Sequence, residues 1–198
     1  MTKAAIALGS ACLAFGISFS LAARAQQASA DGPRYTNGTT LVRPTDYREW
    51  TFLGAGLGMT YEPATSAQST PRFTNVFVNP SSYRSFMRTG KWPDRTIFVL
   101  EGRNSSSEAA INKGGRFQTE LTGLEAEVKD SRFPDGWAFF DFGRAGSSKD
   151  VAEPLSGEKV APCVECHTKH TAVERTFVQF YPTLLDVARR MGTLKPGF

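Results

Sequence analysis

The sequence predicts an α+β fold, in which an antiparallel β-sheet is packed with helices and the chain ends in a helical segment. Short runs of aromatic and β-branched residues, typical of strands, recur between residues 50 and 142. A run with helical spacing follows Asn79-Pro80, and the residues after 162 again have helical character. The length of 198 residues, with 21% charged and 40% hydrophobic, fits one globular domain and excludes a disordered or disulfide-dense chain.

The first 25 residues are predicted to be a signal peptide. They begin with the basic start Met1-Thr2-Lys3 and continue with an uncharged apolar run over residues 4–22. Ala23-Arg24-Ala25 then places small residues at positions −3 and −1 of a cleavage site. An uncleaved membrane anchor is the alternative, because the run approaches the length of a spanning helix. We expect export to the periplasm with cleavage after Ala25.

The mature chain is expected to start with a loose lead-in over residues 26–44, which is polar and rich in Gly, Asn and Thr. A single domain is expected over residues 45–198. It begins with a capped helical turn at residues 45–48 and a strand at residues 50–53. Residues 54–71 hold Gly, Pro, Ser and Thr with almost no apolar pattern, and they are expected to form a loop.

The centre of the domain is expected to combine one helix with strands on both sides of it. A strand is predicted at residues 73–78. Asn79 is a capping residue and Pro80 suits the first helical position, so a helix is predicted to start there and to stop at Gly90. The next strand is predicted at residues 96–101, followed by a polar loop over residues 103–115.

The last part of the chain is expected to change from strands to helices. Strands are predicted at residues 117–128, with a break near Gly123, and at residues 137–142. After a linker over residues 143–162, Thr171-Ala172-Val173-Glu174 has the pattern of a capping box, which predicts a helix start. Pro182 is expected to open a final helix that ends near Gly192.

The residues with the clearest chemistry stand together near the C-terminus. Cys163-Val164-Glu165-Cys166-His167 has the spacing of a c-type haem attachment motif. Two thiols add to the two vinyl groups of the porphyrin, and the adjacent histidine becomes the proximal iron ligand. We therefore expect one covalently attached haem c, held by Cys163, Cys166 and His167, with His167 as the metal ligand. The charge of +4 is small and scattered, and no nucleic-acid partner is expected.

Three other uses of these residues remain open. A redox-active cysteine pair would fit an oxidising compartment, although the flanking sequence lacks a thioredoxin-like strand and helix. A structural zinc site could use both cysteines together with His167 and His170, although such sites usually draw their ligand pairs from separated segments. A structural disulfide between Cys163 and Cys166 would close a very short loop, which gives little stabilisation.

The ligand on the other side of the iron decides between electron transfer and the binding of small ligands. His170 leaves the helix on nearly the same side as His167 and cannot reach the opposite face of the haem. Met87 is expected in the core and Met191 lies near the C-terminus, which leaves Met59 as the remaining candidate. We expect a vacant or weakly filled distal site.

Several stretches taken together resemble the cytochrome P-460 and cytochrome c′-beta family over residues 47–185. They are Tyr47-Arg48-Glu49-Trp50, residues 73–80, Thr89-Gly90, residues 94–99, residues 123–126, Lys129-Asp130-Ser131, residues 137–140, residues 163–167 and residues 177–182. The resemblance implies an antiparallel sheet packed with helices, one haem c and usually a homodimer. It also implies His167 as proximal ligand and an open distal site under the sheet.

The family resemblance implies a choice between two activities. Members similar to cytochrome P-460 oxidise hydroxylamine and carry a lysine cross-linked to the porphyrin. Members similar to cytochrome c′-beta lack the cross-link and bind nitric oxide or carbon monoxide in an apolar pocket. The cross-linking lysine stands just before the Glu that ends the Thr-Ile-x-Val strand, and here Leu100 occupies that position, followed by Glu101. The resemblance therefore favours the non-cross-linked type.

Strand alternation places Phe98 and Leu100 on one face. They line the distal side of the haem if that face looks at it, and otherwise they are ordinary core residues. The sequence thus predicts an exported monohaem c-type protein that binds a small diatomic ligand, with nitric oxide first and carbon monoxide next. Oxidation of hydroxylamine, a peroxidase-like side reaction, and outer-sphere electron transfer to a redox partner protein are the alternatives.

Overall fold

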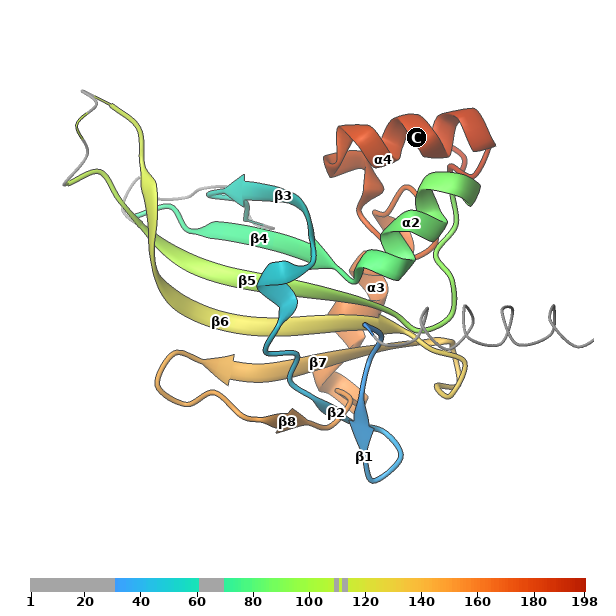
Figure 1. Cartoon of the computed structure of the whole chain (residues 1–198), viewed down its shortest axis with the longest axis horizontal. Helices are drawn as coiled ribbons and strands as arrows, with labels where there is room; N and C mark the ends of the chain where they lie inside the picture. The colour runs from blue at the N-terminus through green and yellow to red at the C-terminus, as the bar shows by residue number, and fades with distance from the viewer. Residues whose placement is uncertain (1–30, 61–69, 109–110, 112–113) are drawn as a thin grey trace, which may run out of the picture. The chain divides into compact units, whose positions relative to one another are not determined.

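Five antiparallel strands form the main sheet in the order β3-β4-β5-β6-β7 (Figure 1). The computed structural model describes residues 31–60, 70–108, 111 and 114–198. The five strands are β3 (Thr51–Leu57), β4 (Phe73–Val78), β5 (Thr96–Ser106), β6 (Phe117–Lys129) and β7 (Trp137–Arg144). The α+β class is confirmed. The predicted signal peptide lies outside the described residues and stays a prediction.

A second, smaller sheet joins the N-terminal residues to a distant part of the chain. Its strands are β1 (Tyr35–Thr36), β2 (Thr40–Val42) and β8 (Val151–Ala152), in the order β1-β2-β8. Leu41 of β2 pairs with Ala152 and is fully buried. Residues 35–36 and 40–42, which lie in the predicted loose lead-in, therefore form strands instead. Residues 31–198 form one compact unit.

Three α-helices and three short 3₁₀ helices complete the described part. They are η1 (Tyr47–Glu49), α2 (Pro80–Thr89), η2 (Gly157–Lys159), α3 (Ala161–Lys169), η3 (Val178–Phe180) and α4 (Pro182–Met191). α2 ends at Gly90 and α4 ends at Gly192, both in the left-handed conformation that glycine tolerates. These two helices confirm the predicted starts and stops. Among the described residues, no helix is long and apolar enough to span a membrane.

Hydrogen bonds from elsewhere in the fold satisfy the start of α2. The Asn79 side chain makes no helix-capping bond, and its Oδ1 instead accepts the backbone N–H of Ile97 at 3.0 Å. The Ser81 backbone N–H donates to the carboxylate of Asp31 at 2.7 Å. A free donor of the first helical turn is thus bound by a residue distant in sequence.

Several predicted boundaries differ from the structure, among them the linker over residues 143–162, which contains β8 and η2. β3 continues to Leu57 and β5 continues to Ser106, into stretches that were expected to be loops. The capping box at residues 171–174 does not start a helix, because the Thr171 hydroxyl donates to the carbonyl oxygen of His167 at 2.5 Å. Glu174 has a φ of 50°, which a helix start would not allow. The predicted break near Gly123 is confirmed by a register shift between β6 and β7.

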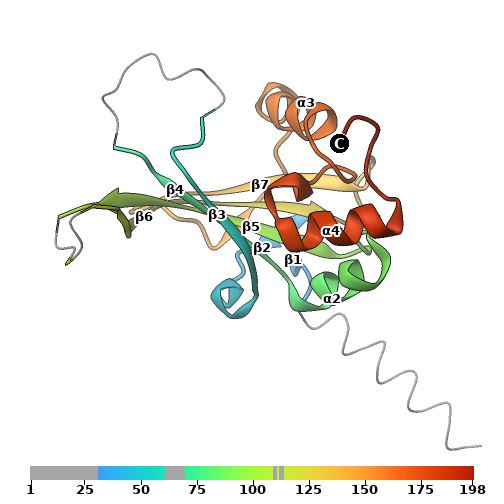
Figure 2. The same ribbon diagram turned by 90° about the horizontal axis from the view of Figure 1, so that it is seen from above.

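The main sheet packs side chains on both of its faces. Ile97, Val99 and Phe140 point to the face covered by β2, β8 and η1, which we call the far face. Val78 and Phe98 point to the other face, which packs against α2 and α4 and which we call the helix face. Both views show the three α-helices gathered toward one end of the sheet (Figures 1 and 2).

Candidate functional site

Helix α3 presents the Cys-x-x-Cys-His residues on its inward side. Cys163, Cys166 and His167 are half-buried, whereas the helix residues Glu165 and Thr168 are exposed. The spacing of three and four residues brings the three side chains to one side of the helix. Within the described residues, both cysteines are free thiols.

The environment of the two thiols does not suit a reactive cysteine pair. Burial raises the pKa of Cys163, and the Glu125 carboxylate raises it further. Burial also raises the pKa of Cys166. Redox-active cysteines need a lowered pKa that stabilises the thiolate. The raised pKa values of the two thiols do not favour the redox alternative, and the thiols are not joined in the alternative disulfide.

The imidazole of His167 is oriented by a backbone carbonyl. Its Nδ1 lies 2.8 Å from the carbonyl oxygen of Arg175, and a carbonyl can only accept a hydrogen bond. We therefore assign the proton to Nδ1, which leaves the Nε2 lone pair of the neutral ring available to a metal. The rings of Phe139 and Phe177 each lie 4.8 Å from the imidazole, in edge-to-face contacts that fix its plane.

The loop that supplies the Arg175 carbonyl is held by polar contacts at both of its ends. The Thr171 hydroxyl donates to the His167 carbonyl, and the Lys195 ammonium donates to the Thr171 hydroxyl at 2.7 Å. Glu174 forms an ion pair of 2.7 Å with Lys129 on β6. Val173 and Thr176 also form an isolated β-bridge. The acceptor of the His167 proton is thus tied to the end of α3 and to the sheet.

Two glutamates of β6 reach the helix face close to the motif. Oε1 of Glu127 lies 3.0 Å from Nδ1 of His167, and only 11% of the Glu127 side chain is exposed. Burial raises the pKa of Glu127, and the nearby His167 opposes this rise. Burial lowers the pKa of His167, but Glu127 and the Arg175 carbonyl together outweigh burial and raise it.

Glu125 lies beside the predicted distal position. It pairs in register with Leu100 on β5, so both side chains point to the helix face. Water reaches the Glu125 side chain, yet the surrounding protein desolvates it, and this desolvation raises its pKa. Asp141 raises the pKa further. A carboxyl group thus neighbours the apolar side chain of Leu100.

Phe98 and Leu100 both lie on the helix face. Phe98 is buried and makes an edge-to-face contact with Trp92, at 4.8 Å between ring centroids. It belongs to the core beneath α2 and α4. Leu100 is half-buried and pairs with Val76 on the other side of β5. A distal role for either residue stays a prediction.

The candidates for a second iron ligand lie in different places. Met59 follows the end of β3 and is exposed. Met87 packs on the helix-face core, and Met191 is exposed at the end of α4. His170 is exposed at the end of α3. No group of three or more His, Cys, Asp or Glu residues in the described ranges is arranged to hold a metal ion, so the zinc arrangement is not formed there.

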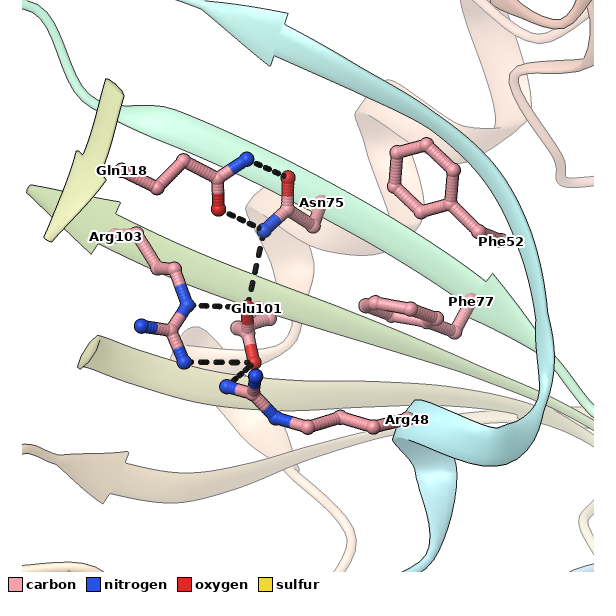
Figure 3. Close-up of a pocket in the computed structure, with 7 residues that line it drawn as sticks. All are labelled: Arg48, Phe52, Asn75, Phe77, Glu101, Arg103 and Gln118. Atoms are coloured by element: carbon pink, nitrogen blue, oxygen red, sulfur yellow. Dashed lines mark hydrogen bonds and ion pairs between the residues drawn. The ribbon is translucent and has the colours of Figure 1, made fainter. Parts of the chain in front are cut away.

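A hollow of about 370 Å³ opens on the far face, and none of its lining residues belongs to the Cys-x-x-Cys-His motif (Figure 3). Its centre is the buried Glu101 carboxylate, which accepts from Arg103 Nε at 2.6 Å and from Arg48 Nη2 at 2.5 Å. Asn75 also donates to Glu101, and Asn75 and Gln118 exchange two hydrogen bonds. The Tyr47 hydroxyl also donates a hydrogen bond to the Glu101 carboxylate. Because these polar groups pair with one another, the network stabilises the sheet and is not part of the Cys-x-x-Cys-His site.

Sequence reasoning missed the residues that surround the imidazole. Glu127 and Arg175 belong to no motif, and Glu127 comes from a different element. Phe177 lies in one of the stretches that resemble the family, but no contact with the imidazole was predicted for it. One signal was available, because alternation along β6 sends Glu125 and Glu127 to the face opposite Leu124 and Ala126.

The fold and this site together indicate the class of haem proteins. The helix presents two thiols and an imidazole whose Nδ1 is already bonded, which fits the donor set that a haem iron and its porphyrin require. The family model for Cytochrome P460 matches residues 44–178. The chain therefore belongs to the cytochrome P460 family, which implies a haem cofactor. A comparison with curated proteins gives no significant match.

Proposed function

We propose that the protein carries one haem c, attached through Cys163 and Cys166, with His167 as the proximal iron ligand. The observation that carries the proposal is the hydrogen bond from Nδ1 of His167 to the Arg175 carbonyl. Metal-ligating histidines nearly always donate their other ring N–H in this way, which fixes the tautomer and the ring orientation. The two thiols on the same side of α3 would form the thioethers.

The function that we propose is reversible binding of a small neutral ligand, nitric oxide first and carbon monoxide next. The haem, held by Cys163, Cys166 and His167, would supply an iron able to bind such a ligand. Position 100 carries Leu, which has no amine for a cross-link. The apolar side chains of Phe98 and Leu100 on the helix face would exclude water and disfavour charged ligands.

Oxidation of hydroxylamine is the second candidate, and Glu125 is the observation that favours it. Its carboxyl group is reached by water, has a raised pKa and lies opposite Leu100. A carboxyl of this kind holds a proton nearer to neutral pH than an ordinary glutamate does. It could therefore exchange protons with a substrate bound on the helix face.

The experiment uses protein exported with a haem maturation system. The wild type should keep its haem through acid-acetone extraction, whereas the double variant Cys163→Ala, Cys166→Ala should lose it. The ferric form should be five-coordinate and high-spin, and the ferrous form should take up nitric oxide and carbon monoxide. Turnover of hydroxylamine with an artificial electron acceptor should be small.

Each alternative gives a different result in the same experiment. A low-spin ferric spectrum that changes in Met59→Ala but not in the control Met191→Ala would indicate electron transfer. Rapid hydroxylamine turnover would indicate the enzyme. Bound zinc in place of haem would contradict the proposal altogether.

We also propose that the protein acts in the periplasm, after removal of the first 25 residues, and that it forms a homodimer. The N-terminal sequence pattern supports export. Strand β3 supports self-association, because it lies at the edge of the main sheet and exposes Phe52 and Leu57. A redox partner protein would be needed if the haem changes oxidation state during its cycle.

A further inference from the structure

We propose that Glu127 is a positioning residue that shares the Nδ1–H of His167 with the Arg175 carbonyl and so sets the electron donation of His167 to the haem iron. This inference rests on the proposed function, because it takes His167 as the proximal ligand.

The geometry around Nδ1 carries the inference. The Nδ1–H points to the Arg175 carbonyl at 2.8 Å, and Oε1 of Glu127 lies only slightly farther, at 3.0 Å. Oε1 of Glu127 is buried and has no hydrogen-bond partner among the described residues. A buried polar atom without a partner is costly. A small rotation of the imidazole would let one N–H serve both acceptors in a three-centre hydrogen bond.

The surroundings of Glu127 keep its carboxylate beside the imidazole. Phe98 and Phe139 are its two register partners on the neighbouring strands, and both are buried. The charged or titratable groups that act on it from other segments include His167, Arg175 and Glu174. Glu127 acts in turn on the Tyr181 hydroxyl and on the Cys163 thiol. The Arg175 guanidinium lies 3.7 Å from Asp135, so it is partly balanced by another carboxylate.

A carboxylate acceptor changes the ligand more than a carbonyl does. Hydrogen bonds from Nδ1–H to a carboxylate are stronger than those to a neutral acceptor and increase the basicity of Nε2. A more basic Nε2 favours ferric over ferrous iron, because the ferric ion carries the greater positive charge. Glu127 would therefore lower the reduction potential of the haem.

The test compares the purified wild-type holoprotein with Glu127→Gln and Glu127→Leu. Glu125→Gln is the matched control, because it makes the same change of side chain two residues away on the same face of β6. The measurements are the reduction potential, by optical titration, and the iron–histidine stretching frequency of the ferrous form, by resonance Raman spectroscopy.

Both Glu127 variants should shift the ferric–ferrous equilibrium at least tenfold toward ferrous iron, which is 59 mV for a one-electron couple. The iron–histidine frequency should fall. The control should shift the equilibrium less and leave the frequency unchanged. The Gln variant decides the case if the Leu variant fails to fold.

The proposal is overturned if Glu127→Gln retains its haem with an unchanged frequency, or if the control gives the same change. Failure of the proposed function would look different, because the wild type itself would then lack a covalently bound haem or a histidine-ligated iron.

Discussion

The side chain at position 100 determines whether an amine can reach the helix face of β5 at that point. Leu100 is half-buried between Val76 and Glu125 in the register of the sheet. In the wild type, mass spectrometry of haem peptides should therefore find haem bound to the peptide that contains Cys163 and Cys166. It should find no peptide in which the haem is bonded to a lysine.

Leu100→Lys should change the optical spectrum of the holoprotein. Its ammonium would enter a largely apolar environment, where it either ligates the iron after losing its proton or pairs with Glu125. Leu100→Met is the control of similar volume without an amine. An unchanged spectrum in the Lys variant would show that position 100 does not face the haem. A wild-type peptide in which the haem is bonded to a lysine would contradict the expectation of no cross-link.

At the scale of the element, the two faces of β5 differ in their contacts. Glu101 forms a polar network on the far face, whereas Leu100 lies on the helix face. Glu101→Leu would leave Arg103, Asn75 and Tyr47 without their shared acceptor. Because the Arg103 side chain is only 19% exposed, the loss should lower the free energy of unfolding by about 3 kcal/mol. The ferric spectrum should stay the same, since Glu101 points to the far face.

Arg48→Gln is the matched control for this network. The Arg48 side chain is 56% exposed, so its ion pair with Glu101 should contribute less than about 1 kcal/mol. Guanidinium denaturation of both holoproteins measures the difference. Equal losses in the two variants, or a changed spectrum in Glu101→Leu, would contradict the separation of the two faces.

The sequence predicted those elements whose signals are local. β4 follows from a run of aromatic and β-branched residues, and α2 follows from Asn79-Pro80 and Gly90. The strand at Leu41 could not be predicted in this way, because its partner β8 is distant in the chain. The capping box failed because the Thr171 hydroxyl donates to the carbonyl oxygens of His167 and Glu174, and because Glu174 has a positive φ that a helix start does not allow.

The same limit applies to the site. Cys163, Cys166 and His167 lie within five residues, and their spacing alone predicts a haem attachment motif. Glu127 comes from a strand and the Arg175 carbonyl from a loop, so only the folded chain brings them to the imidazole. Alternation along β6 places Glu127 on a face but does not tell which helix covers that face.

At the scale of the whole molecule, the edge strand β3 should decide the state of association. Phe52 is 52% exposed there, and pairing of two β3 edges would cover it. Phe52→Lys combined with Leu57→Lys should convert a dimer into a monomer, because lysines oppose the pairing of edge strands. Sedimentation equilibrium measures the mass of each holoprotein.

Ile111→Lys is the control, since Ile111 is exposed but lies outside the strands of the main sheet. It should leave the dimer intact. A wild type that sediments as a monomer would contradict the proposed homodimer. A lysine variant that still dimerises would show that the dimer contact does not involve β3.

The alternation along β5 has a consequence for how such proteins diversify over evolutionary time. Leu100 and Glu101 are adjacent in the chain, but they point to opposite faces of the sheet. On the proposed distal role of Leu100, a lineage can exchange the residue at position 100 while Glu101 keeps its hydrogen bonds to Arg103 and Asn75 on the far face. Selection on reactivity and selection on folding would then act on separate residues, because a substitution at position 100 leaves the hydrogen bonds of Glu101 intact.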